Sequence, residues 1–139
     1  MGLMLDTNVF IHSERSGMQI DFSQWNKYED VYISAVTASE LLVGVHYAKN
    51  ESQKAHRTAF VESVLAKIPI LGFEVEEARV HARLFAALAK QGKMIGAHDL
   101  MIAATAIAHN CAVLTENIEE FSRVPGLETI LFSRLSKSE

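Results

Sequence analysis

Three acidic side chains stand where they could do chemistry together. Asp6 ends a short apolar run, Glu40 lies in the first turn of a helix pattern, and Asp99 opens a nearly all-apolar segment. Hard carboxylate oxygens select Mg²⁺ or Mn²⁺ rather than zinc. If the three carboxylates meet, they repel one another, and a bound cation would relieve that repulsion. The residues therefore suggest a metal site made of Asp6, Glu40 and Asp99.

Each acid also has an ordinary structural explanation. Thr37 and Glu40 have the spacing of a capping box, and Asp99 before an apolar helix is typical of an N-cap. Asp6 could cap the helix that begins near Asn8. Negative charge at a helix N-terminus is worth ~0.3–1 kcal/mol, so each placement is favourable without any metal. Only the meeting of all three carboxylates distinguishes the two explanations.

The remaining pattern predicts the elements that hold these acids. Strands are expected at 2–5, 31–34, 69–71, 112–115 and 128–132, and helices at 8–15, 37–49, 52–67, 74–91 and 99–110. The segment 16–30 is polar, with Trp25 as its expected anchor. Alternating strands and helices predict an α/β three-layer sandwich with a mainly parallel central sheet of four to five strands. Such sheets bind ligands beyond the carboxyl ends of their strands, which is where the three acids would gather.

Length and composition limit the alternatives. The chain has 139 residues, which predicts one domain spanning 1–139, and its 49% apolar residues exclude a disordered chain. Cys111 is the single cysteine, so an internal disulfide is excluded and a reducing, cytoplasmic location is expected. No apolar run reaches the ~18 residues of a membrane span. The net charge of −4 offers no overall attraction to nucleic acid, so a metal or a local patch must bind any phosphate.

Four blocks of the sequence resemble PIN-domain ribonucleases, in particular the VapC-like toxins of bacterial toxin–antitoxin pairs. The blocks are residues 5–8, 31–44, 95–104 and 114–127, in the family's order and at its distances, and the likeness covers essentially the whole chain. The resemblance implies that Asp6, Glu40 and Asp99 bind the divalent metal. Many relatives carry a fourth acid where this chain has Asn117. Glu116 and Glu120 flank that position and are the candidates to replace it.

The activity that the resemblance implies is hydrolysis of RNA phosphodiester bonds by a metal-activated water. Mg²⁺ is the expected ion, and Mn²⁺ is expected to substitute for it. Glu40 is the candidate acceptor for the proton of that water. Four neighbouring polar side chains are expected to orient the carboxylates by hydrogen bonding: Thr7, Asn8, Thr115 and Asn117.

The resemblance also implies partners. A cognate antitoxin is expected to inhibit the enzyme through a groove formed by the helices between Thr37 and Lys67, and the same region is expected to form a symmetric homodimer. Promoter DNA would be contacted only through the antitoxin, in the bacterial cytoplasm, with no membrane involved.

Other polar residues are assigned ordinary positions. His98 is expected to be a turn residue, with phosphate contact as the alternative. Four basic residues between 49 and 57 are expected to lie on a solvated helix face, and binding of the RNA backbone is the alternative. They are Lys49, Lys54, His56 and Arg57. Lys90 and Lys93 lie near the loop before Asp99 and have a better claim to phosphate.

Three other functions remain open. A non-catalytic RNA- or partner-binding module could keep this fold, although the acidic balance and few aromatic residues disfavour a pure RNA binder. A receiver-type signalling domain needs paired acids after the first strand and a lysine near the last strands. Here Asp6 stands alone, and no lysine follows those strands until Lys137. A DNA-directed nuclease would use the same site chemistry.

Overall fold

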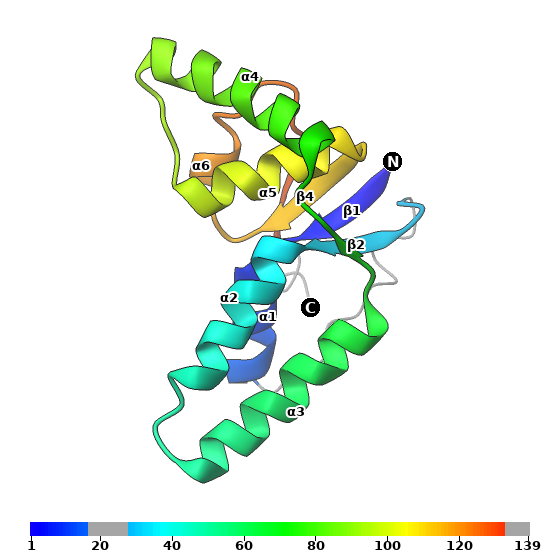
Figure 1. Cartoon of the computed structure of the whole chain (residues 1–139), viewed down its shortest axis with the longest axis vertical. Coiled ribbons are helices and arrows are strands. Elements are labelled where there is room, and N and C mark those ends of the chain that lie inside the picture. The colour runs from blue at the N-terminus through cyan, green and yellow to red at the C-terminus, as the bar shows by residue number, and fades with distance from the viewer. Residues whose placement is uncertain (17–27, 133–139) are drawn as a thin grey trace.

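The chain forms a three-layer α/β sandwich (Figure 1), in a computed structural model that describes residues 1–16 and 28–132. The expected Trp25 anchor lies outside these residues. The strands are β1 (Gly2–Leu5), β2 (Val31–Ser34), β3 (Ile70–Leu71), β4 (Cys111–Thr115) and β5 (Thr129–Leu131). The helices are α1 (Thr7–Ser16), α2 (Ala35–His46), α3 (Glu51–Lys67), α4 (Val75–Gln91), α5 (Ala97–Ala108) and α6 (Ile118–Phe121).

The sheet has the order β3-β2-β1-β4-β5, and every pair of neighbouring strands is parallel. From β1 the chain first builds outward through β2 and β3, and then returns to the other side of β1 to build β4 and β5. The strand order therefore reverses between β1 and β4. In open parallel sheets this reversal leaves a crevice at the carboxyl ends of the two strands, which is the usual ligand site.

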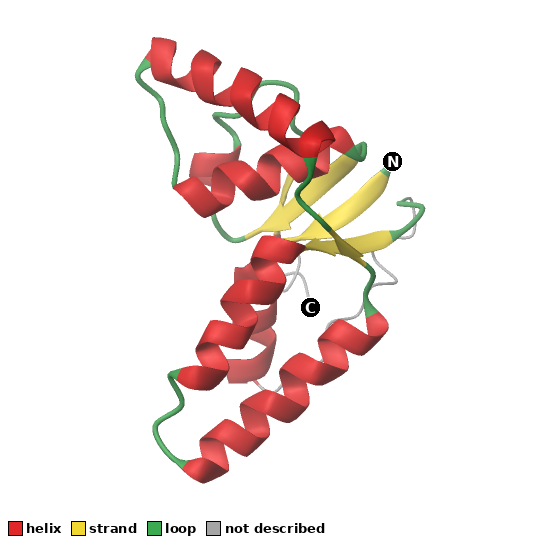
Figure 2. Cartoon of the chain, in the orientation of Figure 1, coloured by secondary structure: helices red, strands yellow, loops and turns green. Residues whose placement is uncertain are grey.

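Helices cover both faces of the sheet (Figure 2). Each face has its own hydrophobic core. Leu3 and Leu5 of β1 pack with the α1, α2 and α3 side, whereas Met4 between them packs with the α4 and α5 side. This alternation follows from the two-residue period of a strand. Because β1 and β4 are buried on both faces, their carboxyl ends are held rigidly where the crevice begins.

The expected strands and helices are present, and their bounds differ by up to three residues: α2, for example, ends at His46 and not at Lys49. α2 begins at Ala35 because the Ser34 hydroxyl caps it, accepting the Thr37 amide at 3.1 Å. The suggested capping box of Thr37 and Glu40 is therefore wrong, and Thr37 lies buried inside the helix. α5 has Gly96 as its N-cap, so Asp99 lies within the first turn and is not the cap.

Two helices, α6 and α4, complete the comparison with the expected elements. The short helix α6 was not among the expected elements. α4 ends as expected at Gly92, whose left-handed φ of 65° is readily adopted by glycine. Within the described residues, no helix is long and apolar enough to cross a membrane.

Candidate active site

Asp6 forms the floor of the crevice at the end of β1, and it is only 3% exposed. Its Oδ1 accepts the backbone N–H of Thr7 at 2.8 Å, and its Oδ2 accepts the hydroxyl of Thr115 at 2.8 Å. The Thr115 hydroxyl oxygen in turn accepts the backbone N–H of Asn117 at 2.8 Å. Burial raises the pKa of Asp6, the two hydrogen bonds lower it, and the charge of Glu40 raises it again. The two central strands thus hold one buried carboxylate in a fixed orientation.

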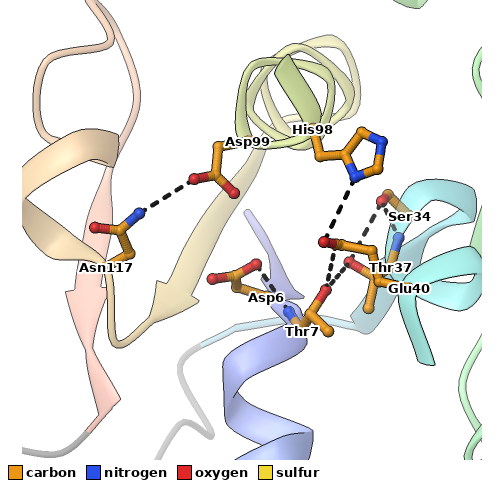
Figure 3. A network of polar contacts seen from close by, with 8 residues as sticks. All are labelled: Asp6, Thr7, Ser34, Thr37, Glu40, His98, Asp99 and Asn117. Carbon is orange, nitrogen blue, oxygen red and sulfur yellow. Dashed lines mark hydrogen bonds and ion pairs between the residues drawn. The ribbon is translucent and has the colours of Figure 1, made fainter. Parts of the chain in front are cut away.

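Glu40 projects from α2 toward the same space (Figure 3). Its Oε1 accepts the Thr7 hydroxyl at 2.7 Å, and the Thr7 hydroxyl lies 3.3 Å from that of Thr37. Ser34 continues this row, with its hydroxyl 3.5 Å from that of Thr37. The other carboxylate oxygen, Oε2, lies 3.5 Å from Nδ1 of His98. A row of hydroxyl groups therefore connects the end of β2 to the carboxylate of Glu40.

Asp99 reaches the site from the first turn of α5, where it faces Asn117 and Glu120. The Asn117 amide donates to Asp99 Oδ2 at 3.1 Å and to Glu120 Oε2 at 2.8 Å. The pKa of Asp99 is raised to about 7, chiefly by burial, then by a hydrogen bond with Glu120 and by the charges of Asp6 and Glu120. The pKa of Glu120 is lowered by that same hydrogen bond. Asp99 therefore keeps its proton in mildly acidic solution and loses it near neutral pH.

The structure brings most of the expected site residues together. Figure 3 shows the carboxylates of Asp6, Glu40 and Asp99 pointing toward one space between α2, α5 and the ends of the strands. Of the two candidates for a fourth acid, Glu120 joins the cluster. The Oε1 of Glu116 is buried without a hydrogen-bond partner among the described residues, and Glu116 makes no hydrogen bond or ion pair with the cluster within residues 1–16 and 28–132. The four clustered acids are Asp6, Glu40, Asp99 and Glu120.

Several other residues lie differently from the expectations. Asn8 is exposed on α1 and takes no part in this network among residues 1–16 and 28–132. His98 lies in the first turn of α5 and not in a turn before it. Arg57 donates to the carbonyl oxygen of Gly44 at 2.8 Å and lies 4.0 Å from Glu14, so its guanidinium is tied between helices and is not a free RNA guide.

Ser34, Thr37 and His98 were not predicted as site residues. A serine that ends a strand and starts a helix was the available signal for Ser34, because such residues cap helices. Nothing in the local pattern distinguishes Thr37 from other helical threonines. Its part in the site depends on the approach of α1 to α2, which is a tertiary contact.

The donor set fits a hard divalent cation in ligand type. Four carboxylates provide oxygen ligands, and the raised pKa values of Asp6 and Asp99 show that their negative charge is poorly compensated by the protein. In the arrangement seen here, however, no three acidic, histidine or cysteine side chains of the described residues are spaced to share an ion. Binding would therefore require the carboxylates to turn toward the ion and away from part of their present hydrogen bonds.

The raised pKa of Asp99 predicts how stability depends on pH in the absence of metal. Its pKa is 3.8 as an unperturbed carboxyl and about 7 in the folded protein, so its contribution is fully present below pH ~4 and is lost as the pH rises through 7. Between pH 5 and pH 8, we expect the free energy of unfolding to fall by about 1–2 kcal/mol less in Asp99→Asn than in the unmodified chain, because the variant has no carboxyl group to ionise at this position. The figure is smaller than the full pKa shift would give, since solvent screens part of it. Urea unfolding in EDTA at the two pH values measures this difference.

The matched control is Glu119→Gln, which removes one negative charge from an 89% exposed side chain on α6. It is expected to leave the pH dependence of the free energy of unfolding unchanged. If Asp99→Asn and the unmodified chain showed the same pH dependence of the free energy of unfolding, ionisation of Asp99 would not destabilise the fold, contrary to this prediction.

Comparison with known proteins shows the family to which the chain belongs. Residues 3–127 match the family described as the PIN domain. Ribonuclease VapC1 of Rickettsia felis is 41% identical over 133 residues, which are 96% of this chain and 98% of the relative. The tRNA(fMet)-specific endonuclease VapC of Shigella flexneri is 32% identical over 127 residues, covering 91% of this chain and 94% of the relative.

A solved structure agrees with these relatives. The crystal structure of VapBC2 from Rickettsia felis, bound to a DNA fragment from its promoter, contains a chain that superposes with a TM-score of 0.80 at 29% identity. The match covers 94% of this chain and 98% of the other. The sheet, its flanking helices and the crevice between β1 and β4 therefore belong to a shared architecture.

Proposed function

Because this chain belongs to the PIN domain family and, within it, to the VapC ribonucleases, we propose that it is an Mg²⁺-dependent endoribonuclease toxin inhibited by a cognate antitoxin. The observation that carries this proposal is that Asp6, Glu40 and Asp99 face one space at the reversal of strand order, close enough for their charges to act on one another, with Glu120 beside Asp99. Helix capping alone does not require acids from such distant parts of the sequence to face one space.

The residues have distinct roles in the proposed reaction. Asp6 and Asp99 would hold Mg²⁺, with Glu40 and Glu120 at its sides, and Mn²⁺ would substitute for it. When bound, the ion supplies a water of lowered pKa and positive charge against the phosphate oxygens. Thr115 holds the carboxylate of Asp6, as the 2.8 Å hydrogen bond supports.

The remaining polar groups orient the acids and move protons. The Asn117 amide holds Asp99 and Glu120 side by side, and therefore orients carboxylates without adding charge. Glu40 is the carboxylate that would accept the proton of the attacking water, since it is the more exposed of the acids held by Thr7.

A cavity beside Glu40 supports the proposed inhibition. It has a volume of about 150 Å³ and lies between α1, α2 and α3. Apolar side chains line much of it, together with two acids, one arginine and one glycine: Phe10, Ile11, Leu41, Phe60 and Val61, with Glu14, Glu40, Arg57 and Gly44. An antitoxin segment could place an apolar side chain in this cavity and a basic group against the acids of the active site. Promoter DNA would be contacted through the antitoxin.

Self-association is proposed on separate grounds. Exposed apolar side chains remain on α2, where Leu42 and Val43 are 38% and 47% exposed, and at Tyr47 directly after it, which is 79% exposed. A symmetric homodimer formed through this end of α2 would cover them.

Incubation of the purified chain with RNA tests the proposed function. Initiator tRNA is the first substrate to try, since one relative is named for it. We expect endonucleolytic cleavage with Mg²⁺ or Mn²⁺ and none with excess EDTA, and no cleavage of a DNA strand of the same sequence. RNA binding without cleavage in either metal would instead favour the non-catalytic binding module.

A further inference from the structure

His98 lies beside Glu40 at the edge of the acid cluster (Figure 3). It stands in the first turn of α5, directly before Asp99, and its side chain is 61% exposed. The Glu40 side chain is 32% exposed, and Asp6 is only 3% exposed. Exposure therefore falls from His98 through Glu40 to Asp6, so the imidazole lies on the solvent side of the acids, where a bound nucleic acid strand would approach.

The two ring nitrogens of His98 have different surroundings. Nδ1 lies 3.5 Å from Glu40 Oε2, so this side of the ring faces the carboxylate. No hydrogen bond or ion pair within the described residues involves Nε2, and Figure 3 shows it on the side of the ring away from the carboxylates. Nε2 is therefore available to a group that flanks the reacting phosphate.

The chemistry of Nε2 narrows the identity of that group. If the imidazole is neutral with its proton on Nδ1 toward Glu40, Nε2 is an acceptor, and if the ring is protonated, Nε2 is a donor. A phosphate oxygen would suit only the donor form. A hydroxyl group both donates and accepts, so it suits Nε2 in either form. The ribose 2′-hydroxyl is such a group, and it is the one that distinguishes RNA from DNA.

We propose that His98 is a specificity-determining residue whose Nε2 binds the 2′-hydroxyl of a nucleotide next to the cleaved phosphate. This inference rests on the proposed nuclease function and gives it a means of selecting RNA. The contact lies beside the carboxylates, so it contributes to binding and positioning and not to the bond-breaking step. Its loss therefore raises KM more than it lowers kcat.

The test combines protein variants with single-atom changes in the substrate. A cleavable RNA oligonucleotide is prepared with one 2′-deoxy nucleotide at each position around the cut, and kcat and KM are measured for the unmodified chain and for His98→Ala. At one flanking position we expect the 2′-deoxy change to lower kcat/KM of the unmodified chain by about 5- to 10-fold, as for a single hydrogen bond. His98→Ala is expected to lose about the same factor on all-RNA substrate and to show no further loss at that position.

Two further variants complete the experiment. His98→Gln retains an amide that can both donate and accept, so we expect it to recover part of the sensitivity to the 2′-deoxy change. His46→Ala removes an exposed imidazole from the last turn of α2 and is expected to leave that sensitivity intact.

Each alternative result has a defined meaning. An equal 2′-deoxy penalty in the unmodified chain and in His98→Ala, or no penalty at any flanking position, would overturn the inference. A dependence of the His98→Ala effect on the identity of one base, and not on a 2′-hydroxyl, would also overturn it. Absence of RNA cleavage by the unmodified chain would instead contradict the proposed function itself.

Discussion

Replacing Asp6 or Asp99 with asparagine is expected to lower the rate of RNA cleavage by about 1,000-fold or more, because each change removes a charged ligand from the proposed metal site. Asparagine keeps the shape of the side chain and one acceptor oxygen. At Asp6 that oxygen can still accept the Thr7 amide, and the new amide group can donate to the Thr115 oxygen in place of the present bond. The fold should therefore survive, and single-turnover kinetics with enzyme in excess measure the loss.

The control for this prediction is again Glu119→Gln, which changes the net charge equally at an exposed position. Its cleavage rate is expected to stay within about twofold of the unmodified chain, since the charge of a fully solvated side chain is largely screened by salt. Circular dichroism and thermal unfolding check that all variants are folded. Cleavage by both Asp6→Asn and Asp99→Asn within tenfold of the unmodified chain would contradict the roles assigned to the two acids.

The second large effect concerns Thr115, which is completely buried at the end of β4. Thr115→Val keeps the shape of the side chain but removes two hydrogen bonds of 2.8 Å. In one the hydroxyl donates to Asp6 Oδ2, and in the other it accepts the backbone N–H of Asn117. Because a buried carboxylate and a backbone N–H each lose a partner, we expect a loss of about 2–3 kcal/mol in the free energy of unfolding. Urea denaturation in EDTA measures it, and a fall in cleavage rate of at least about tenfold should accompany it.

Thr105→Val provides the matched comparison. Thr105 is equally buried, but its hydroxyl donates to the carbonyl oxygen of Met101 within α5. That oxygen keeps the backbone hydrogen bond of the helix when the hydroxyl is removed. We expect this variant to lose less than about 1 kcal/mol and to keep full activity. Equal losses for the two variants would show that Thr115 contributes only as any buried threonine does, and that it does not hold Asp6.

The parts of the site that the sequence could predict depend on the ends of regular elements. Asp6 directly follows an apolar strand, and Asp99 lies at the start of an apolar helix, so a parallel sheet brings both to one edge. Asn117 was predicted as an orienting residue, and its amide does bridge Asp99 and Glu120. The gathering of Asp6, Asp99 and Asn117 at one edge follows from the order of the strands and helices alone.

The parts that it could not predict depend on small local differences or on tertiary contacts. Ser34 and Thr37 have nearly equal preference for capping, so the start of α2 was placed two residues too late. Glu116 and Glu120 could not be ranked, because only the turn into α6 decides that Glu120 faces Asp99. The hydrogen bond between Thr7 and Glu40 joins α1 to α2, and no local pattern encodes it.

The most direct test of the central claim is to locate the ion itself. A crystal of the unmodified chain grown with Mn²⁺, measured at a wavelength where manganese scatters anomalously, shows the position of the metal independently of the protein coordinates. The account predicts an anomalous peak within coordination distance of carboxylate oxygens of Asp6 and Asp99, and no such peak in crystals of Asp99→Asn. A fully active protein without a peak at these carboxylates, or with its metal bound elsewhere, would contradict it.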